Sequence, residues 1–147
     1  MAYARNHPTL DGPDQSVWLR SASGSAVQLR KLGADSEWIT AIVWSVDSRR
    51  IAFLTMDAVL DVYDVASRSR LASGYVRPNR GDYPPRYAVR DVSFSGDGGA
   101  VTFLPCERNY DVTNDRPERL TCRDSRESLT IAELADRQAR LYQGRVF

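Results

Sequence analysis

Short apolar segments alternate with polar, turn-forming segments along most of the chain, and this spacing is typical of β-strands joined into hairpins. Residues 17–20 and 26–30 form one such pair around a turn rich in serine and glycine. Residues 59–65 alternate between apolar and polar side chains, as a strand with two unlike faces does. Weaker strands are predicted at 70–76 and 119–123. The pattern predicts a mainly β, antiparallel fold.

One segment of the chain occurs twice, because residues 43–54 and 93–104 align without a gap. In both copies an apolar strand ends in an aromatic residue and a serine, a short turn follows, and a second apolar strand begins. Asp47 and Asp97 occupy the same position of the two turns, where aspartate accepts hydrogen bonds from backbone amides. Each copy therefore predicts a β-hairpin. The equivalent apolar positions are predicted to be buried: Trp44, Ile51, Phe53, Phe94, Val101 and Phe103.

The first copy continues into a further strand that ends in Tyr63-Asp64. Together, residues 42–48, 51–54 and 60–64 resemble one blade of a WD-repeat-type β-propeller, with Tyr63-Asp64 at the place of the family's Trp-Asp pair. The family's Gly-His pair is absent from this sequence. The resemblance implies antiparallel, propeller-like blades, and it says little about activity.

The second copy resembles the same blade, and its fourth strand is expected within residues 120–124. The two repeats together cover about residues 38–124. Propellers close with about four to eight blades, whereas a chain of 147 residues holds about three. The edges of the sheets therefore need to be covered. The sequence leaves three arrangements possible: a C-terminal helix that caps the stack, a ring of several copies, or a sandwich of two sheets.

The end of the chain has a helical period. Residues 129–143 are predicted to form one amphipathic helix, with Ile131 and Leu134 on its apolar face. Thr130 and Glu133 have the spacing of a capping box. The apolar face is expected to pack on the core or, alternatively, to dock on a partner.

The expected organisation is one domain over residues 1–147. Antiparallel β repeats fill residues 15–124, between an irregular polar segment at 1–14 and the C-terminal helix. A chain of 147 residues is long enough to form one hydrophobic core without a metal ion or a disulfide.

Composition argues against several kinds of chemistry. Twenty basic and nineteen acidic side chains give a net charge of +1, which is not the strongly basic balance of a typical nucleic-acid-binding domain. The single histidine, His7, lies in a polar segment, and two cysteines are too few for a four-cysteine zinc site. Asp57, Asp61 and Asp64 lack a calcium-loop pattern and are expected at strand ends and turns. We expect no catalytic residues, no cofactor, no metal and no enzyme activity.

Two cysteines bear on the compartment. Cys106 and Cys122 flank a polar, turn-rich stretch, so that they could face each other across a hairpin. The sequence leaves open whether they are reduced or form a disulfide. No apolar run is long enough to span a membrane, and no secretory leader is evident. The expected localisation is cytoplasmic, or periplasmic or secreted if the two cysteines are paired.

A proline-containing loop, residues 77–86, interleaves arginine with tyrosine. Large contact area with a polar end makes both residue types frequent in protein interfaces. The candidate protein-binding residues are Arg80, Tyr83, Arg86 and Tyr87.

These observations predict a non-enzymatic, protein-binding β-repeat domain whose partner is another protein or a second copy of the chain. A specific version is a small bacterial inhibitor or immunity-type protein. One alternative is a structural remnant or self-assembling fragment of a larger β-propeller. Another is binding of single-stranded nucleic acid through the Arg/Tyr loop 75–90, where stacking and guanidinium contacts would act together.

Overall fold

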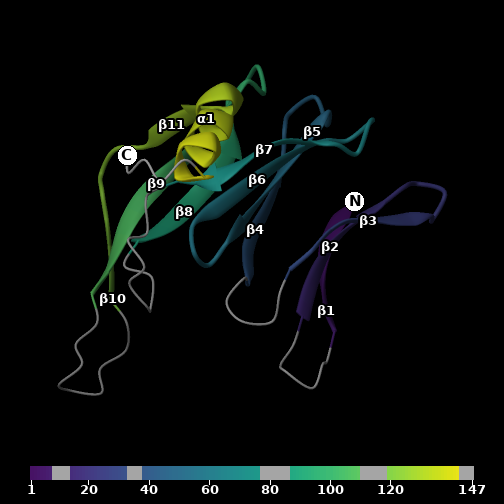
Figure 1. The fold of residues 1–147 in the computed structure, drawn as a ribbon, viewed down its shortest axis with the longest axis horizontal. Coiled ribbons are helices and arrows are strands. Elements are labelled where there is room, and N and C mark those ends of the chain that lie inside the picture. Colours follow the sequence, from purple (N-terminus) through teal and green to yellow (C-terminus); the bar gives the residue numbers. More distant parts are fainter. Residues whose placement is uncertain (8–13, 33–37, 77–86, 110–118, 143–147) are drawn as a thin grey trace.

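Three antiparallel sheets and one helix make up the described part of the molecule (Figure 1). The computed structural model describes residues 1–7, 14–32, 38–76, 87–109 and 119–142. The arrangement confirms a mainly β, antiparallel fold with a C-terminal α-helix. Because three sheets are present, the described chain is not a sandwich of two.

The sheets follow one another in chain order. The first consists of β1 (Ala2–His7), β2 (Asp14–Arg20) and β3 (Ala26–Lys31). The second consists of β4 (Ile39–Trp44), β5 (Arg50–Thr55), β6 (Val59–Asp64) and β7 (Arg70–Tyr75). In the third, β9 (Ala100–Asn109) pairs with β8 (Tyr87–Phe94) on one side and with β10 (Arg119–Cys122) and β11 (Glu127–Thr130) on the other. The helix α1 spans Ile131–Tyr142.

The sheets are stacked in a propeller-like manner. The first strand of the second sheet, β4, contacts β1 of the preceding sheet and β8 of the following one. Figure 1 shows the three sheets side by side, with the second between the other two. The second sheet is therefore covered on both faces.

Burial on both faces explains the sequence of β5. Ile51 and Phe53 pack against the first sheet, in a cluster that contains Val17. The alternate residues of β5 are Ala52 and Leu54, and they belong to the cluster that is shared with the third sheet. A strand with neighbours on both faces is apolar throughout instead of alternating.

The predicted core is confirmed at five of its six positions. Ile51, Phe53, Phe94, Val101 and Phe103 are buried, and only Trp44, at the end of β4, is half-buried. The two copies of the repeat form the hairpins β4–β5 and β8–β9. The sequence repeat therefore corresponds to a structural repeat, in which each hairpin buries its aromatic residue against the preceding sheet.

The turns of the two hairpins are built alike, as predicted. Ser45 donates its hydroxyl to Asp47 over 2.6 Å, and the Arg49 amide donates to the same carboxylate over 3.1 Å. In the second turn Ser95 donates to Asp97 over 2.6 Å, and the Gly99 amide donates over 2.9 Å. The third turn residue has a left-handed backbone in both, φ 58° at Ser48 and 70° at Gly98. These hydrogen bonds lower the pKa of both aspartates, and the bond from the serine hydroxyl has a larger effect than the bond from the backbone amide.

The last sheet differs from the middle one on its far face. Val43 and Ala52 of the first copy pack against the third sheet. At the matching positions of the second copy stand Ser93 and Thr102, whose hydroxyls lie 2.8 Å apart on the outside. Polar side chains at these two positions need no further sheet to cover them.

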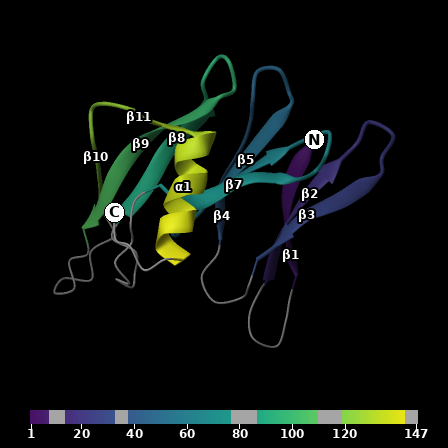
Figure 2. The same ribbon diagram turned by 45° about the horizontal axis from the view of Figure 1, so that its top comes forward.

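The helix α1 packs on the core, as one of the two alternatives expected. It contacts β7 (Figure 2), and Leu134 is buried in the cluster between the second and third sheets. The capping box is present: Thr130 Oγ1 accepts from the Glu133 amide over 3.1 Å, and Glu133 accepts from the Thr130 amide over 2.8 Å. The helix thus lies beside β7 and β11 and covers the core between the second and third sheets.

Three expectations about the strands are wrong. Residues 1–14 are not all irregular, because β1 occupies Ala2–His7 and satisfies its backbone groups by pairing with β2. Tyr63-Asp64, expected at the end of a fourth strand, ends the third strand of its sheet, since β7 lies outside β6. Residues 119–122 take the third position of the last sheet and not the fourth, because β10 pairs directly with β9.

The doubly covered core gives a prediction for stability. Replacing Phe103, which is 1% exposed, by alanine should lower the free energy of unfolding by ~3–5 kcal/mol, because the cavity cannot collapse between two packed sheets. Chemical denaturation measures this loss. Val46→Ala is the control, since Val46 is 82% exposed and should change stability by less than about 0.5 kcal/mol. Equal effects of the two substitutions would contradict this packing.

The turn aspartates give a prediction for pH. Their pKa values are lower in the folded chain than the usual value of about 3.9. Their contribution is therefore present above about pH 4 and is lost as the pH falls through the folded-state values. The denaturation midpoint of Asp97→Asn should lie below that of the parent chain at pH 7, and the gap between the two should narrow as the pH falls below about 4. A gap that stays constant with pH would contradict the role of this carboxylate.

Candidate functional site

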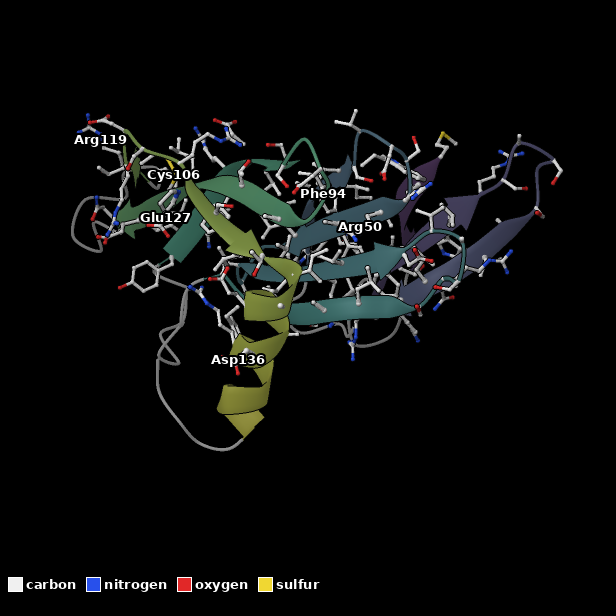
Figure 3. All side chains as sticks on the ribbon, turned by 90° about the horizontal axis from the view of Figure 1, so that it is seen from above. Arg50, Phe94, Cys106, Arg119, Glu127 and Asp136 are labelled. Carbon is white, nitrogen blue, oxygen red and sulfur yellow. A yellow bond between two sulfur atoms is a disulfide. The ribbon has the colours of Figure 1, made fainter. Side chains whose placement is uncertain are left out.

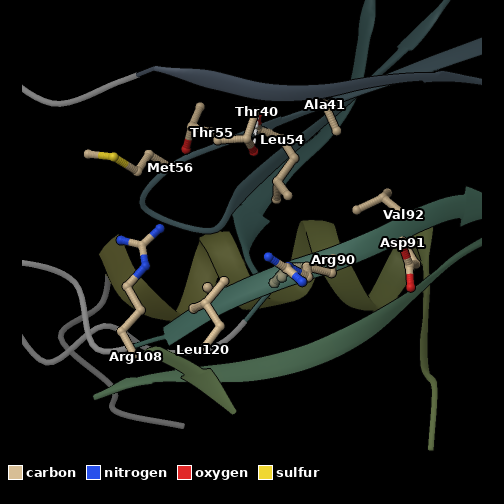
Figure 4. Close-up of a pocket in the computed structure, with 12 residues that line it drawn as sticks. Thr40, Ala41, Leu54, Thr55, Met56, Arg90, Asp91, Val92, Arg108 and Leu120 are labelled. Atoms are coloured by element: carbon tan, nitrogen blue, oxygen red, sulfur yellow. Dashed lines mark hydrogen bonds between the residues drawn. The ribbon is translucent and has the colours of Figure 1, made fainter. Parts of the chain in front are cut away.

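A cleft of about 440 Å³ opens between the second and third sheets (Figure 4). One side is formed by β4, β5 and the turn after β5, where Leu54 and Met56 line it. The other side is formed by β8, β9 and β10, which contribute Arg90, Arg108 and Leu120. The cleft is therefore assembled from strands of both repeats.

A bulge in β8 shapes the cleft. The pairing of β8 with β9 shifts between Arg90 and Ser93, and Asp91 has a left-handed φ of 51°. The Arg126 guanidinium donates to the Asp91 carbonyl oxygen and, over 3.0 Å, to the Ser93 hydroxyl. A bulge changes the direction of the side chains around it. Here it separates the start of β8, which lines the cleft, from its end, which packs in the core at Phe94.

Two arginines give the cleft its charge. Arg90 is exposed and Arg108 is half-buried, and Figure 4 shows Arg108 extending from the third sheet toward Met56. Asp91 is the acidic residue among the lining side chains. The Thr55 hydroxyl on the opposite side accepts from the Val59 amide over 3.2 Å. The arrangement is a positively charged cleft with aliphatic walls.

The structure tests the predicted contact residues only in part. Arg80, Tyr83 and Arg86 lie outside the described residues. Tyr87 is the first residue of β8, where it is half-buried and pairs with Glu107 of β9. Its neighbour Ala88 lines the cleft, so Tyr87 stands beside it.

Sequence reasoning missed the other side of the cleft. Arg108 and Leu120 are directly opposite each other in the β9–β10 pairing. Their neighbourhood, residues 107–118, suggests a polar loop, whereas β9 in fact continues to Asn109. Trp38 was also missed; it is 42% exposed, and its carbonyl oxygen accepts from the Met56 amide over 2.7 Å. The sequence shows this tryptophan directly before an apolar strand, but only the structure shows that it is exposed.

A disulfide fixes the position of β10. Cys106 of β9 and Cys122 of β10 are direct partners in the sheet, and their sulfur atoms are bonded at 2.05 Å (Figure 3 labels Cys106). The bond resolves the alternative that the sequence left open. Because Leu120 lies in the same short strand, the disulfide also holds one wall of the cleft in place.

The clustered carboxylates have structural roles. Asp61 is not at a strand end as expected; it lies within β6, fully buried, and forms an ion pair with Arg30 of the first sheet. Asp64 accepts from the Ser67 hydroxyl and amide in the turn after β6, and these bonds lower its pKa. Across the described residues, no group of three or more His, Cys, Asp or Glu side chains is placed to hold a metal ion.

The described ranges contain no helix with the length and apolar character needed to span a bilayer. No protein-family model matches the sequence, and no curated protein sequence matches it. Similarity is found only among solved structures.

The fold is similar to part of the uncomplexed acylaminoacyl peptidase of Pyrococcus horikoshii, with a TM-score of 0.57 and 15% identity. The match covers 90% of this chain and 22% of that chain, so this chain spans about a fifth of its length. At this identity the likeness concerns the fold alone.

Two other solved structures match less well. Kluyveromyces lactis Hsv2 is 14% identical, with a TM-score of 0.38 over 84% of this chain and 43% of that one. The Cps50 (Swd1) β-propeller domain of Myceliophteria thermophila is 13% identical, with a TM-score of 0.37 over 79% and 38%. Scores this low support no argument about this chain.

Proposed function

We propose that the chain is a non-enzymatic, protein-binding β-repeat domain related to WD-repeat-type propeller blades. Its contact surface is the end of the sheet stack where the cleft opens. The observation that carries this proposal is the combination of an exposed tryptophan, Trp38, with the arginines of the cleft. Tryptophan and arginine are the side chains most enriched among residues that dominate binding energy.

Tyr87 extends the same surface. It starts β8 directly beside the cleft, and in the sequence it follows the segment that contains Arg80, Tyr83 and Arg86. Trp38 precedes β4 and its carbonyl oxygen accepts from the Met56 amide, and Tyr87 is paired within the third sheet, so the backbone of both residues is held by the sheets. Little entropy is therefore lost on binding, which favours affinity.

A specific form of the proposal is a small bacterial inhibitor or immunity-type protein that covers a site on its partner. The compact chain and the net charge of +1 are compatible with it. The Cys106–Cys122 disulfide favours a periplasmic or secreted location, because disulfides persist in oxidising compartments.

Two other functions are less well supported. A self-assembling propeller fragment would stack a further sheet on the third one, but Ser93 and Thr102 make that outer face polar. Binding of nucleic acid through residues 75–90 would call for a basic domain, and the chain is close to neutral.

Site-specific cross-linking tests the proposed function. Trp38 and Tyr87 are replaced, one at a time, by a photoreactive benzophenone amino acid. Ser23, which is exposed in the turn between β2 and β3, is the control position. We expect positions 38 and 87 to cross-link the same protein in extracts of the source cells, and excess unmodified chain to compete. Equal capture from position 23, or no specific capture from 38 and 87, would refute the proposal.

A further inference from the structure

A second cleft, of about 390 Å³, lies between the first and second sheets, and we call it the Trp44 cleft. On one side it is lined by β2, β3 and the turn between them, and on the other by the end of β4 and the turns after β4 and β6. Trp44 is half-buried, and the aliphatic side chains of the lining are Leu19, Val27 and Val65. A mostly apolar cleft of this size, with a few polar groups, is typical of a small-molecule site.

The charged side chains of this lining are arginines, one from each sheet. Arg20 ends β2, where its amide donates to the Met1 carbonyl oxygen over 2.7 Å, and Arg68 lies in the turn between β6 and β7. Both side chains are exposed, and neither guanidinium has a hydrogen bond or an ion pair within the described ranges. Among the lining residues of the described structure there is no aspartate or glutamate. The cleft therefore attracts an anion from both of its sides.

The acidic residues of the adjoining turns are engaged within those turns. Asp64 accepts from the Ser67 hydroxyl over 2.6 Å and from the Ser67 amide over 2.7 Å. Asp47 accepts from the Ser45 hydroxyl over 2.6 Å and lies 3.9 Å from the Arg49 guanidinium. The contacts of both carboxylates are thus made with residues outside the lining of the Trp44 cleft, and they leave the charges of its arginines unpaired.

The backbone of the turns is an independent sign that side chains are needed at this cleft. The four hairpin turns at this end of the stack each hold one residue with a left-handed φ, which is 90° at Gly24, 58° at Ser48, 59° at Arg68 and 70° at Gly98. Glycine adopts this conformation without steric cost. Glycine occupies the two positions outside the lining, whereas Ser48 and Arg68 line the cleft. Residues held in such a conformation cluster at ligand-binding sites.

The walls of the cleft are formed without a ligand. The Val65 amide donates to the Arg49 carbonyl oxygen over 2.8 Å, so the two turns of the second sheet that line the cleft are tied together. On the other side, the Ser21 amide donates to the Ser25 carbonyl oxygen over 2.9 Å and closes the turn between β2 and β3. A ligand therefore meets a site whose backbone is already held by hydrogen bonds, which reduces the entropy lost on binding.

We propose that the Trp44 cleft binds a small anionic molecule with a flat, apolar body. The body packs on Trp44 and the aliphatic walls, and its carboxylate or phosphate group lies at the mouth, between the sides from which Arg20 and Arg68 come. Each arginine contributes on its own, because one guanidinium is enough for charge-assisted hydrogen bonds to either group. This site goes beyond the proposed protein contact, which lies on the opposite face of the second sheet.

Isothermal titration calorimetry with three naphthalene probes tests the proposal. The charged probes are 2-naphthoate and 2-naphthyl phosphate, and the neutral control is 2-naphthamide. We expect at least one charged probe to bind at least about tenfold more tightly than the amide, because only an anion forms charge-assisted hydrogen bonds with the arginines. The tighter of the two charged probes identifies the anionic group. Equal affinity of all three probes, or no binding of the charged probes, would overturn the proposal.

Matched arginine variants locate the binding. Arg68→Gly should weaken the better charged probe about tenfold, while the thermal unfolding midpoint stays unchanged or rises, because glycine accepts the φ of 59° without strain. Arg20→Gln should weaken the same probe as well. Arg119→Gln, which removes an exposed arginine at the start of β10, is the control and should change the affinity less than about twofold.

Equal effects of Arg68→Gly and Arg119→Gln would place the probe elsewhere and contradict the proposal. Unchanged affinity in both Arg68→Gly and Arg20→Gln would contradict it too, even if the probe binds. The cross-linking at positions 38 and 87 reports on a different surface, so the protein contact and the small-molecule site can fail separately.

Discussion

A buried ion pair joins the first two sheets, and the burial of a carboxylate between them depends on it. Asp61 lies in the middle of β6 with no exposed surface, and Arg30 of β3 reaches across the sheet interface to pair with it. Arg70 of β7 adds a second positive charge 4.0 Å from the same carboxylate. A carboxylate can be buried only when such a partner is present, because its desolvation is otherwise too unfavourable. Together with the apolar cluster around Phe53, the pair therefore sets how the first sheet lies on the second.

The way the stack ends determines where the molecule can bind. The middle sheet has apolar residues on both faces, whereas the third sheet replaces Val43 and Ala52 by Ser93 and Thr102 on its outer side. The helix α1 packs beside β7 and buries Leu134 in the core between the second and third sheets. The outer face of the third sheet is thus suited to water, and the cleft between the second and third sheets is the surface that combines charge, apolar walls and an adjacent exposed tryptophan.

The hairpins could be predicted from sequence because their signals are local. A serine, an aspartate two residues later and two apolar strands define each turn, and the structure confirms both. The sequence offered the pairing of β9 with β10 as a possible hairpin between Cys106 and Cys122, but it did not indicate that β11 lies on the same side of β9. The cleft was missed because its lining comes from two different sheets, and the sequence does not show how these sheets pack. The ion pair between Asp61 and Arg30 could not be predicted either, because the two residues lie in different sheets and meet only where these sheets pack.

The most direct test of this account is a double-mutant cycle on Arg30 and Asp61, followed by the free energy of unfolding. Arg30→Met should destabilise the chain by about 3–5 kcal/mol, because it leaves the buried Asp61 carboxylate without its main counter-charge. Adding Asp61→Leu should restore most of that loss, since two apolar side chains can fill the same space without a charge. A harmless Arg30→Met, or a double variant as unstable as the sum of both single changes, would contradict the ion pair as the contact that joins the sheets.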